Sequence, residues 1–421
     1  MIGFLLKTER TTLTFLNLGS PTGLKFLVEH GASRAIFEMG VEHAPGAAPF
    51  SLGLRPREEQ LLADLTAVGM APRGTGVLGA WDGRTSLFVT HMHLDHSALV
   101  PCVHPDVPLY YPEAMEPLRE ACARAGYLPW RQPPGTPVAD RQCVAAGDIE
   151  VEFVAVDHDL PGAAGLLVRT PELTLAYTGD HRWHGLDPQL TEGFAAAARG
   201  AQVLLHEVVS LGREPIVAIP GQPPAELELG ETDVIERFGR LLDGASALVV
   251  VNLYPMNRSR VHAFGAACAA RGRSLLLKRQ AATIADWPLV LEDVDAARRH
   301  PERYCVQLEF GSLPTLIDLR PPPGSVYVHS NGVPLGPYDP TYPIMVAWAR
   351  AMGMELVSLG SSGHSRPADV ARMVEAVRPQ VVLPVHSRRP EALRVPGVRV
   401  LLPEVHRPYA VDDLGVASTR S

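Results

Sequence analysis

The sequence has few cysteines, no long apolar run and no excess of basic residues. Its five cysteines are widely spaced and form no C-x-x-C pair, which argues against a disulfide framework and a cysteine zinc site. No apolar stretch is long enough to cross a bilayer. The start, MIGFLLKTERTTLTF, has a short apolar stub without a basic region before it or a small-residue cleavage site. We therefore expect no signal peptide and a cytoplasmic protein.

The charge balance is acidic, with a net charge of −8 over 421 residues. A polyanionic partner would therefore have to be held by local basic groups and not by the field of the whole protein. The length predicts two domains with substantial cores, and 46% hydrophobic with 20% charged residues is typical of a globular protein.

Short β-branched and apolar runs that end in Gly, Asp or His dominate the first half of the chain. They predict strands at 12–19, 24–31, 34–40, 85–91, 149–158, 166–170, 173–180 and 202–209. From about residue 211 a Pro/Gly-rich stretch leads into a different pattern. Helix, strand and helix follow one another at 231–244, 246–254 and 257–272, which predicts an α/β unit with its own parallel sheet. A helix with one apolar face at 367–379 and a strand at 380–386 come last.

The stretch FVTHMHLDHSALV, residues 88–100, places three histidines and one aspartate directly after an apolar run. His91 and His93 point to the same side by the period of two, while Asp95 and His96 follow on a turn. Imidazole and carboxylate ligands at this density suit Zn²⁺ or Mn²⁺. The alternative is a histidine-rich surface loop, but the H-x-H-x-D-H spacing after a strand favours a metal site.

This stretch resembles the signature of the metallo-β-lactamase superfamily. His158 in VDHDLPGA and Asp180 in AYTGDH match the ligands that follow later in that superfamily. The resemblance implies an α/β protein with the four-layer αββα fold and a dinuclear metal site at the sheet edges. It does not imply a substrate, because this fold hosts many kinds of hydrolase.

Three later motifs resemble those of the β-CASP group, the nucleic-acid-processing branch that includes RNase J. They carry Glu207 in LLHEVVS, His364 in SSGHS and His386 in LPVHS. The resemblance implies residues 1–210 as the first part of the metallo-β-lactamase domain, 211–345 as an inserted α/β β-CASP domain and 346–421 as the completion. The residues after Glu207 and after His386 depart from the group's pattern, which bears on substrate preference. The chain ends soon after its last motif, so we expect the short form without an additional C-terminal domain.

Carried over by position, the resemblance implies two divalent cations bridged by Asp180. The remaining ligands would be His91, His93 and His158 for one cation, and Asp95, His96 and His386 for the other. Two such cations would activate a water for in-line attack at phosphorus. His364, oriented by Glu207, would be the acid that protonates the leaving 3′ oxygen. A local salt bridge for Glu207 and a helix-capping role for His364 are the alternatives.

A set of further residues is predicted to contact nucleic acid, either by the resemblance or because Gly-rich turns and arginines can meet phosphates. They are Asn257, Arg260, Ser330, Asn331, Ser362, Gly363 and Arg388. The plain alternatives are a Gly/Pro turn around Ser330 and a solvated basic pair at Arg388.

The sequence thus predicts a cytoplasmic metal-dependent nuclease that hydrolyses phosphodiester bonds of RNA, and it leaves single-stranded DNA open as a second substrate. We expect single-stranded RNA as the partner, no membrane, and Zn²⁺ ahead of Mn²⁺; a homodimer is left open. The insertion would cover the metal site and favour a single strand over a duplex. The alternatives are a hydrolase of a small ester, thioester or lactone, and a catalytically silent nucleic-acid-binding protein.

Overall fold

The computed structural model describes residues 10–18, 23–41, 48–51, 53–127, 133–212 and 229–418 of the chain. The Pro/Gly-rich stretch that we expected before the inserted unit, residues 213–228, lies outside the described residues. Among the residues described, no helix combines the length and the apolar character needed to span a membrane.

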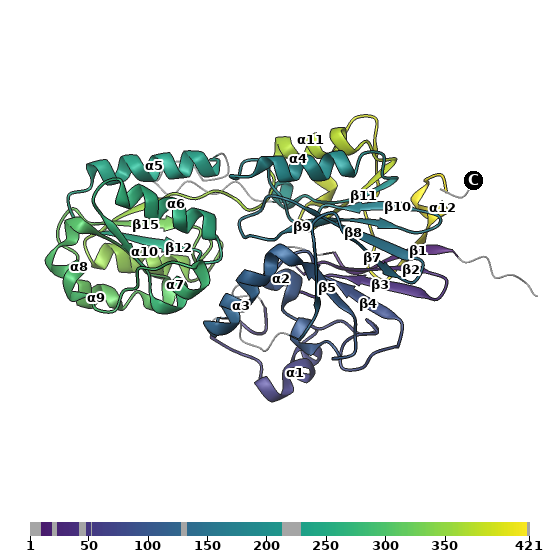
Figure 1. The fold of residues 1–421 in the computed structure, drawn as a ribbon, viewed down its shortest axis with the longest axis horizontal. Coiled ribbons are helices and arrows are strands. Elements are labelled where there is room, and N and C mark those ends of the chain that lie inside the picture. The colour runs from purple at the N-terminus through teal and green to yellow at the C-terminus, as the bar shows by residue number, and fades with distance from the viewer. Residues whose placement is uncertain are drawn as a thin grey trace, which may run out of the picture.

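Two mixed sheets form the larger unit, on the right of Figure 1. In the described part of the chain the first sheet has seven strands in the order β19 (Pro408–Ala410), β1 (Thr11–Asn17), β2 (Lys25–His30), β3 (Ser33–Phe37), β4 (Thr85–Phe88), β5 (Leu109–Pro112) and β6 (Thr136–Val138). The second sheet, within the same described residues, also has seven, in the order β18 (Arg399–Val400), β17 (Val381–Val385), β11 (Val203–Glu207), β10 (Thr174–Tyr177), β9 (Ala164–Arg169), β8 (Ile149–Ala155) and β7 (Cys143–Ala146).

An apolar core fills the space between the two sheets. Strand β1 alternates buried and half-buried residues, as expected of a strand with one face on the core. Strands β11 and β17 are buried along their whole length because helices cover their other face. Phe26 stacks on Phe37 with ring centroids 4.6 Å apart and meets Tyr177 of the second sheet edge-on at 5.1 Å. Aromatic contacts across the gap therefore tie the sheets together.

Helices cover the outer faces of both sheets. Residues of α1 (Leu61–Ala67) and α3 (Glu116–Arg124) pack on the first sheet, whereas α4 (Pro188–Ala197) and α11 (Pro367–Val377) pack on the second. The apolar face predicted for α11 is buried through Val370, Met373, Val374 and Val377. Two short helices, α2 (Leu94–Ser97) and α12 (Val411–Leu414), lie at the sheet edges. The predicted αββα order is confirmed.

The inserted unit, on the left of Figure 1, has a sheet in which every pairing is parallel. Its order in the described chain is β13 (Ser274–Leu276), β14 (Tyr304–Gln307), β12 (Val249–Leu253), β15 (Val326–Ser330) and β16 (Glu355–Ser358). The helices around it are α5 (Glu231–Gly244), α6 (Arg258–Ala269), α7 (Arg279–Ala285), α8 (Asp295–Arg299), α9 (Thr315–Leu319) and α10 (Tyr342–Ala351). Because β16 pairs with β15, the sheet extends to Ser358, past the boundary expected at residue 345.

The inserted unit docks on the larger unit through side chains that follow β12 and lie in α7. Met256 and Ile284 are buried in the cluster that also contains Met92, Leu118 and Cys122 of the larger unit. The backbone agrees, because α3 and α7 lie in contact and Arg258 donates to the carbonyl of Pro117 at 3.1 Å. A shared apolar core therefore fixes how the inserted unit sits.

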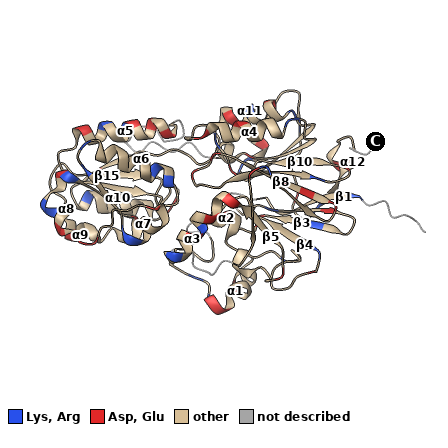
Figure 2. Cartoon of the chain, in the orientation of Figure 1, with Lys and Arg blue, Asp and Glu red and all other residues tan. Residues whose placement is uncertain are grey.

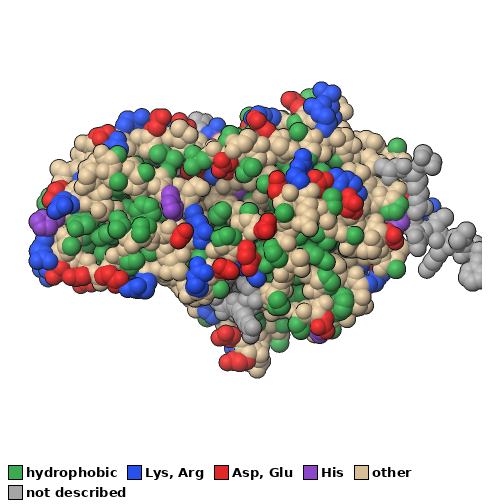
Figure 3. All heavy atoms as spheres, viewed as in Figure 1, with side chains coloured by type: hydrophobic (Ala, Val, Ile, Leu, Met, Phe, Trp, Pro, Cys, Tyr) green, Lys and Arg blue, Asp and Glu red, His purple; other side chains and the backbone are tan. Residues whose placement is uncertain are grey.

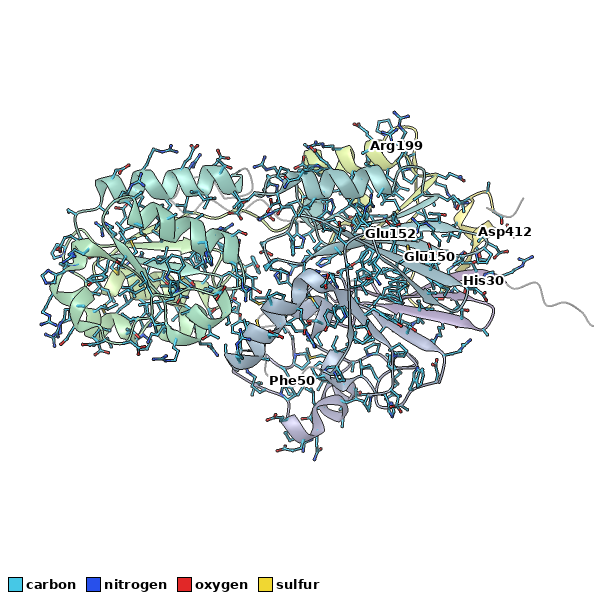
Figure 4. All side chains as sticks on the ribbon, viewed as in Figure 1. His30, Phe50, Glu150, Glu152, Arg199 and Asp412 are labelled. Carbon is cyan, nitrogen blue, oxygen red and sulfur yellow. The ribbon has the colours of Figure 1, made fainter. Side chains whose placement is uncertain are left out.

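Strands β8 and β9 of the second sheet carry ordinary charged pairs. Glu150 and Glu152 of β8, both labelled in Figure 4, accept hydrogen bonds from Arg169 of β9 at 3.0 and 2.6 Å. These side chains are partly exposed, and such pairs contribute only about 0–1 kcal/mol each. The stability of the sheets therefore rests on the core between them.

Replacing Phe26 by Ala should lower the free energy of unfolding by about 3–5 kcal/mol, because it removes a ring packed against both sheets. Ile317→Ala, at a side chain that is 56% exposed, is the control and should change it by less than about 0.5 kcal/mol. Urea unfolding followed by tryptophan fluorescence and circular dichroism measures both. Equal effects of the two changes would contradict the assignment of this core.

Candidate metal centre

The predicted ligands converge because the strands that carry them end at one edge of the sandwich. His91 and His93 follow β4, His158 follows β8 and Asp180 follows β10. The parallel run of β10, β11 and β17 brings Asp180 beside Glu207 and His386, since carboxyl ends of parallel strands share an edge. Asp95 and His96 lie in α2, directly after the H-x-H turn.

Three imidazoles form the first group of potential ligands. Nδ1 of His93 lies 3.2 Å from Nε2 of His91 and 3.1 Å from Nε2 of His158. Together with an oxygen of Asp180, these donor atoms all lie within 4.8 Å of one another. Zn–N bonds of about 2.0–2.1 Å in a tetrahedral site separate two ligand nitrogens by about 3.3 Å, so the spacing fits one cation.

The second group of potential ligands shares Asp180 with the first. Nε2 of His386 lies 3.2 Å from Oδ2 of Asp95 and 3.2 Å from Nε2 of His96. Oδ2 of Asp180 is 3.3 Å from Nε2 of His96 and 3.5 Å from Nε2 of His386. His91 approaches the same oxygen at 3.7 Å. Asp180 therefore lies between the two groups, where a bridging carboxylate is expected.

Burial and charge act differently on the two groups. Burial lowers the pKa of His158 to about 4 and that of His91 well below its ordinary value, so both rings are neutral and keep a free lone pair. In the second group burial also acts to lower the pKa of His386, but Asp180 and Asp95 outweigh burial and raise this pKa to about 9. Burial is outweighed at Asp180 too, since His386 and His96 hold its pKa well below the ordinary value. The second group therefore attracts positive charge, for which protons and a metal ion compete.

The carboxylate of Asp180 provides the test of whether a metal fits. It is 1% exposed, and neither of its oxygens has a hydrogen-bond partner among the described residues. A buried carboxylate without donors is costly, and coordination of a cation removes that cost. Neutral imidazoles and carboxylates are also the ligands of Zn²⁺ and Mn²⁺ sites. The described residues thus fit one or two divalent cations.

Glu38 supports the site from behind and was not recognised from the sequence. Its carboxylate is fully buried, accepts from the backbone N–H of Thr90 at 3.2 Å and lies 3.2 Å from Nδ1 of His96. It also accepts from the hydroxyl of Thr90, which itself lies 3.0 Å from Nδ1 of His91. One carboxylate therefore orients a ring of each group. The signal was a lone acidic residue at the end of the apolar strand RAIF.

Two residues at this edge have left-handed backbone conformations that non-glycine residues rarely adopt. The φ angle is 62° at Glu38 and 58° at His386. Such a conformation costs of order 1–3 kcal/mol and persists where the surroundings require it. At His386 the backbone N–H donates to the carbonyl of Leu18 at 2.9 Å, which fixes the turn. The surroundings therefore hold the backbone in place at both of these positions.

His364 and Glu207 lie together beside Asp180. Nδ1 of His364 is 3.6 Å from Oδ2 of Asp180 and 3.6 Å from Oε2 of Glu207. Glu207 is buried and accepts from the backbone N–H groups of Ser365 at 3.2 Å and Val209 at 3.0 Å. Burial opposes it, but His364 lowers the pKa of Glu207 to about 2. Glu207 is therefore an ionised anchor for the loop that carries His364.

A buried ion network links the metal edge to the inserted unit. Glu231, the first residue of α5, accepts from Arg182 at 2.8 Å and from Nε of Arg260 at 3.0 Å. Arg182 also donates to Asp157 at 3.1 Å, and Arg260 donates to the carbonyl of Ser361 at 3.2 Å. These side chains are 5% exposed or less. The network joins both units to the loop that precedes His364.

Most of the residues predicted to contact nucleic acid belong to this network. Asn257 caps α6 and donates to Glu231 at 3.4 Å, and Arg260 also donates to Asn331. Asn257, Arg260 and Ser330 are buried and bond within the protein, whereas Asn331 is half-buried. Gly363, another residue of the predicted set, packs closely on a candidate ligand. A Cβ at this position would lie 2.8 Å from Cε1 of His158, so a larger residue would not fit.

Ser362 and Arg388 complete the predicted set. Ser362 is 9% exposed, and its carbonyl accepts from Nε2 of His184 at 3.0 Å, so it too belongs to the protein interior. Arg388 is exposed, two residues after His386. Of the predicted contacts, Arg388 is the one that is exposed.

Charges of both signs are interspersed over the molecule. Figure 2 shows Lys and Arg mixed with Asp and Glu on both units. On the face shown in Figure 3, acidic and basic side chains also lie side by side where the units meet. This agrees with the net charge of −8 and favours a few local contacts to an anionic partner over a broad basic surface.

Comparison with known proteins relates the chain to bacterial ribonucleases. No family model matches it. It is 26% identical over 337 residues to Ribonuclease J of Mycolicibacterium smegmatis, covering 72% of this chain and 58% of the relative. It is 24% identical over 345 residues to Ribonuclease J of Mycobacterium tuberculosis, covering 73% and 59%. The chain thus spans less than two thirds of the length of these relatives.

A solved structure matches almost the whole chain. A crystal structure of a protein of unknown function from Enterococcus faecalis V583 superposes with a TM-score of 0.82 at 25% identity. The match covers 96% of this chain and all of the other. The two-sheet unit and the inserted unit therefore occur together in another protein of similar extent.

Glu231→Ala should destabilise the protein by about 3–5 kcal/mol, because it leaves two buried guanidinium groups without their carboxylate. Glu236→Ala, an exposed residue of the same helix paired with Arg240, is the control and should cost less than about 1 kcal/mol. Thermal and urea unfolding measure the difference. A small effect at Glu231 would show that the network does not join the units.

The same network predicts a pH dependence. Arg260 and Arg182 outweigh burial and lower the pKa of Glu231 to about 2, against an ordinary value of 4.5. A depressed folded-state pKa contributes stability above the unfolded pKa that is lost as the pH falls toward the folded one. Wild type should therefore lose more stability than Glu231→Gln between about pH 4.5 and 2. Parallel pH profiles of the two would contradict this.

Proposed function

Because the chain is an RNase J-like member of the β-CASP group of the metallo-β-lactamase superfamily, we propose that it is a metal-dependent nuclease that hydrolyses phosphodiester bonds of RNA. The observation that carries the proposal is the convergence of two ligand groups on the buried carboxylate of Asp180. Without a cation, the convergence leaves a buried carboxylate without a hydrogen-bond donor, beside the rings of His91 and His158 whose pKa values burial lowers.

Two divalent cations, Zn²⁺ or Mn²⁺, are the proposed cofactors. His91, His93 and His158 would hold one cation and Asp95, His96 and His386 the other, with Asp180 shared. When bound, such a pair supplies Lewis-acid activation of water and neutralises charge on a phosphate. Glu38 and Thr90 lie behind the ligand rings and would orient them toward the two cations.

His364 is the proposed general acid. Its ring is 18% exposed and lies beside Asp180, so it reaches both the metal edge and solvent. Glu207 fixes the loop by accepting from the backbone N–H of Ser365, next to His364, and faces the ring at 3.6 Å. In hydrolysis His364 would transfer a proton to the leaving 3′ oxygen, and Glu207 would hold the ring in place for that transfer.

The substrate proposal is single-stranded RNA, with single-stranded DNA as a second candidate. The names of the relatives support RNA. The inserted unit supports a single strand, because Tyr254 after β12 brings its ring 5.8 Å from that of His93 and so covers the metal edge. A narrow path to the metal edge would admit a flexible single strand more readily than a stiff duplex. We propose that the protein acts in RNA processing or decay in the cytoplasm, where its five free thiols would stay reduced.

The domain division that we propose follows from sheet pairing. The first part of the metallo-β-lactamase domain would end near residue 210, and the β-CASP domain would end after β16, with the remainder completing the larger unit. The parallel pairing of β16 with β15 supports the later end. The return of β17 beside β11 supports the completion.

End-labelled single-stranded RNA, a blunt RNA duplex and single-stranded DNA of the same sequence test the function. We expect the single-stranded RNA to be cut fastest, by protein loaded with Zn²⁺ or Mn²⁺. Asp180→Ala should remove this activity and keep the fold, since the cores do not depend on the metal edge. Product lengths report whether cuts are internal or terminal. Full activity of Asp180→Ala, or hydrolysis of a thioester or lactone with none of RNA, would overturn the proposal.

His364→Ala should lower turnover on RNA by about 10²- to 10⁴-fold, the usual contribution of a general acid. Its metal content should equal that of wild type, because the role is separate from the ligand set. The matched control is His300→Ala, an exposed histidine of the inserted unit that lies more than 60 residues along the chain from every ligand motif. Turnover under saturating substrate and elemental analysis are the measurements. Loss of a metal ion in His364→Ala would make this residue a ligand.

A further inference from the structure

An additional carboxylate lies beside the first group of ligands. Asp159 directly follows His158, and its Oδ1 lies 3.3 Å from Nε2 of His93 and 3.4 Å from Nε2 of His158. This oxygen is buried and has no hydrogen-bond partner among the described residues. None of the motifs described above assigns it a role. Its neighbour Asp157 differs, because it is engaged with Arg182.

Each imidazole ring of the first group has one nitrogen that faces the other ligands and one that faces away from them. For His91 this nitrogen, Nδ1, lies 3.0 Å from the hydroxyl of Thr90. For His158 it is Nδ1, which lies 2.7 Å from the carbonyl of Gly363. Two of the three rings thus have an oxygen behind them that can fix their orientation and tautomer.

His93 is turned the other way round. Its Nδ1 faces the nitrogens of His91 and His158, so its outer nitrogen is Nε2. The oxygen within reach of that nitrogen is Oδ1 of Asp159 at 3.3 Å. A carboxylate that accepts the outer N–H of a ligand histidine fixes its tautomer and makes the inner nitrogen a stronger donor.

We propose that Asp159 is a positioning residue that holds His93 with Nδ1 toward the first cation and so sets the affinity of that site. The inference rests on the metal-dependent function proposed above. Gly363 helps, because a Cβ there would lie 2.8 Å from Cγ of Asp159, so only glycine lets the loop before His364 close over the carboxylate. The role concerns the first cation and leaves the second, at Asp95 and His386, unaffected.

The test is a zinc titration of metal-free protein against a competing chelator. In Asp159→Asn one of two sites should weaken by about 10- to 100-fold while the other keeps its wild-type affinity. Asp159→Ala should weaken the same site further, since alanine offers no acceptor. Asp187→Asn, which removes an exposed carboxylate at the start of α4, is the control and should bind as wild type does.

Two further readouts separate positioning from a merely structural role. With Co²⁺ in place of Zn²⁺, Asp159→Asn should shift the visible absorption of the first site, which packing alone would not change. The melting temperature of metal-free Asp159→Asn should stay close to that of wild type, because the amide oxygen of Asn can still accept from Nε2 of His93. Two wild-type affinities and an unchanged spectrum in Asp159→Asn would overturn the proposal.

The titration also separates this inference from the proposed function. A wild-type protein that binds two cations and cuts no RNA would remove the nuclease function, and the zinc affinities would still decide the role of Asp159. A wild-type protein that cuts RNA, with both sites unchanged in Asp159→Asn, would remove the role of Asp159 alone. A wild-type protein that binds no zinc would overturn both.

Discussion

The arrangement of the metal edge depends on one buried charge, the carboxylate of Asp180. Four imidazole nitrogens, from His91, His96, His364 and His386, approach its Oδ2 at 3.3–3.7 Å, and no described residue donates a well-formed hydrogen bond to it. A carboxylate removed from water must be compensated by positive charge. The rest of the edge follows from this requirement, because the rings, the strained turn at His386 and Glu38 all hold compensating groups in place.

A second buried charge organises the junction between the units. Glu231 belongs to the inserted unit, and Arg182 follows Asp180 by two residues in the larger one. Arg260 connects the same carboxylate to the backbone before His364. Removing one member leaves the other charges buried and unpaired, which costs more free energy than the intact network contributes. The network therefore favours the arrangement of the units in which its members are paired. The loop that carries His364 is therefore held by contacts from both sides.

Burial decides which polar residues are available for a substrate. Arg260 is 1% exposed and belongs to the junction, whereas Arg388 is exposed beside the metal edge. The two look alike in a sequence, since both follow a strand end within a motif. With charges of both signs mixed over the surface, contacts of this local kind are the ones that an anionic strand would find.

The sequence by itself predicted many of the strands from local patterns, and it predicted candidate ligands from the spacing of one motif and from a family resemblance. Apolar runs that end in His, Asp or Glu predicted β4, β8, β10 and β11, and the H-x-H-x-D-H spacing singled out the first four ligand candidates. Only the tertiary structure decided what lies behind these residues. Glu38, Asp159 and Glu231 are single acidic residues with no motif of their own. The fold brings Glu38 to Thr90, 52 residues later in the chain, and Asp159 to His93, 66 residues earlier. Spacing along a chain reports which side chains share a strand, whereas burial and through-space charge depend on which strands become neighbours.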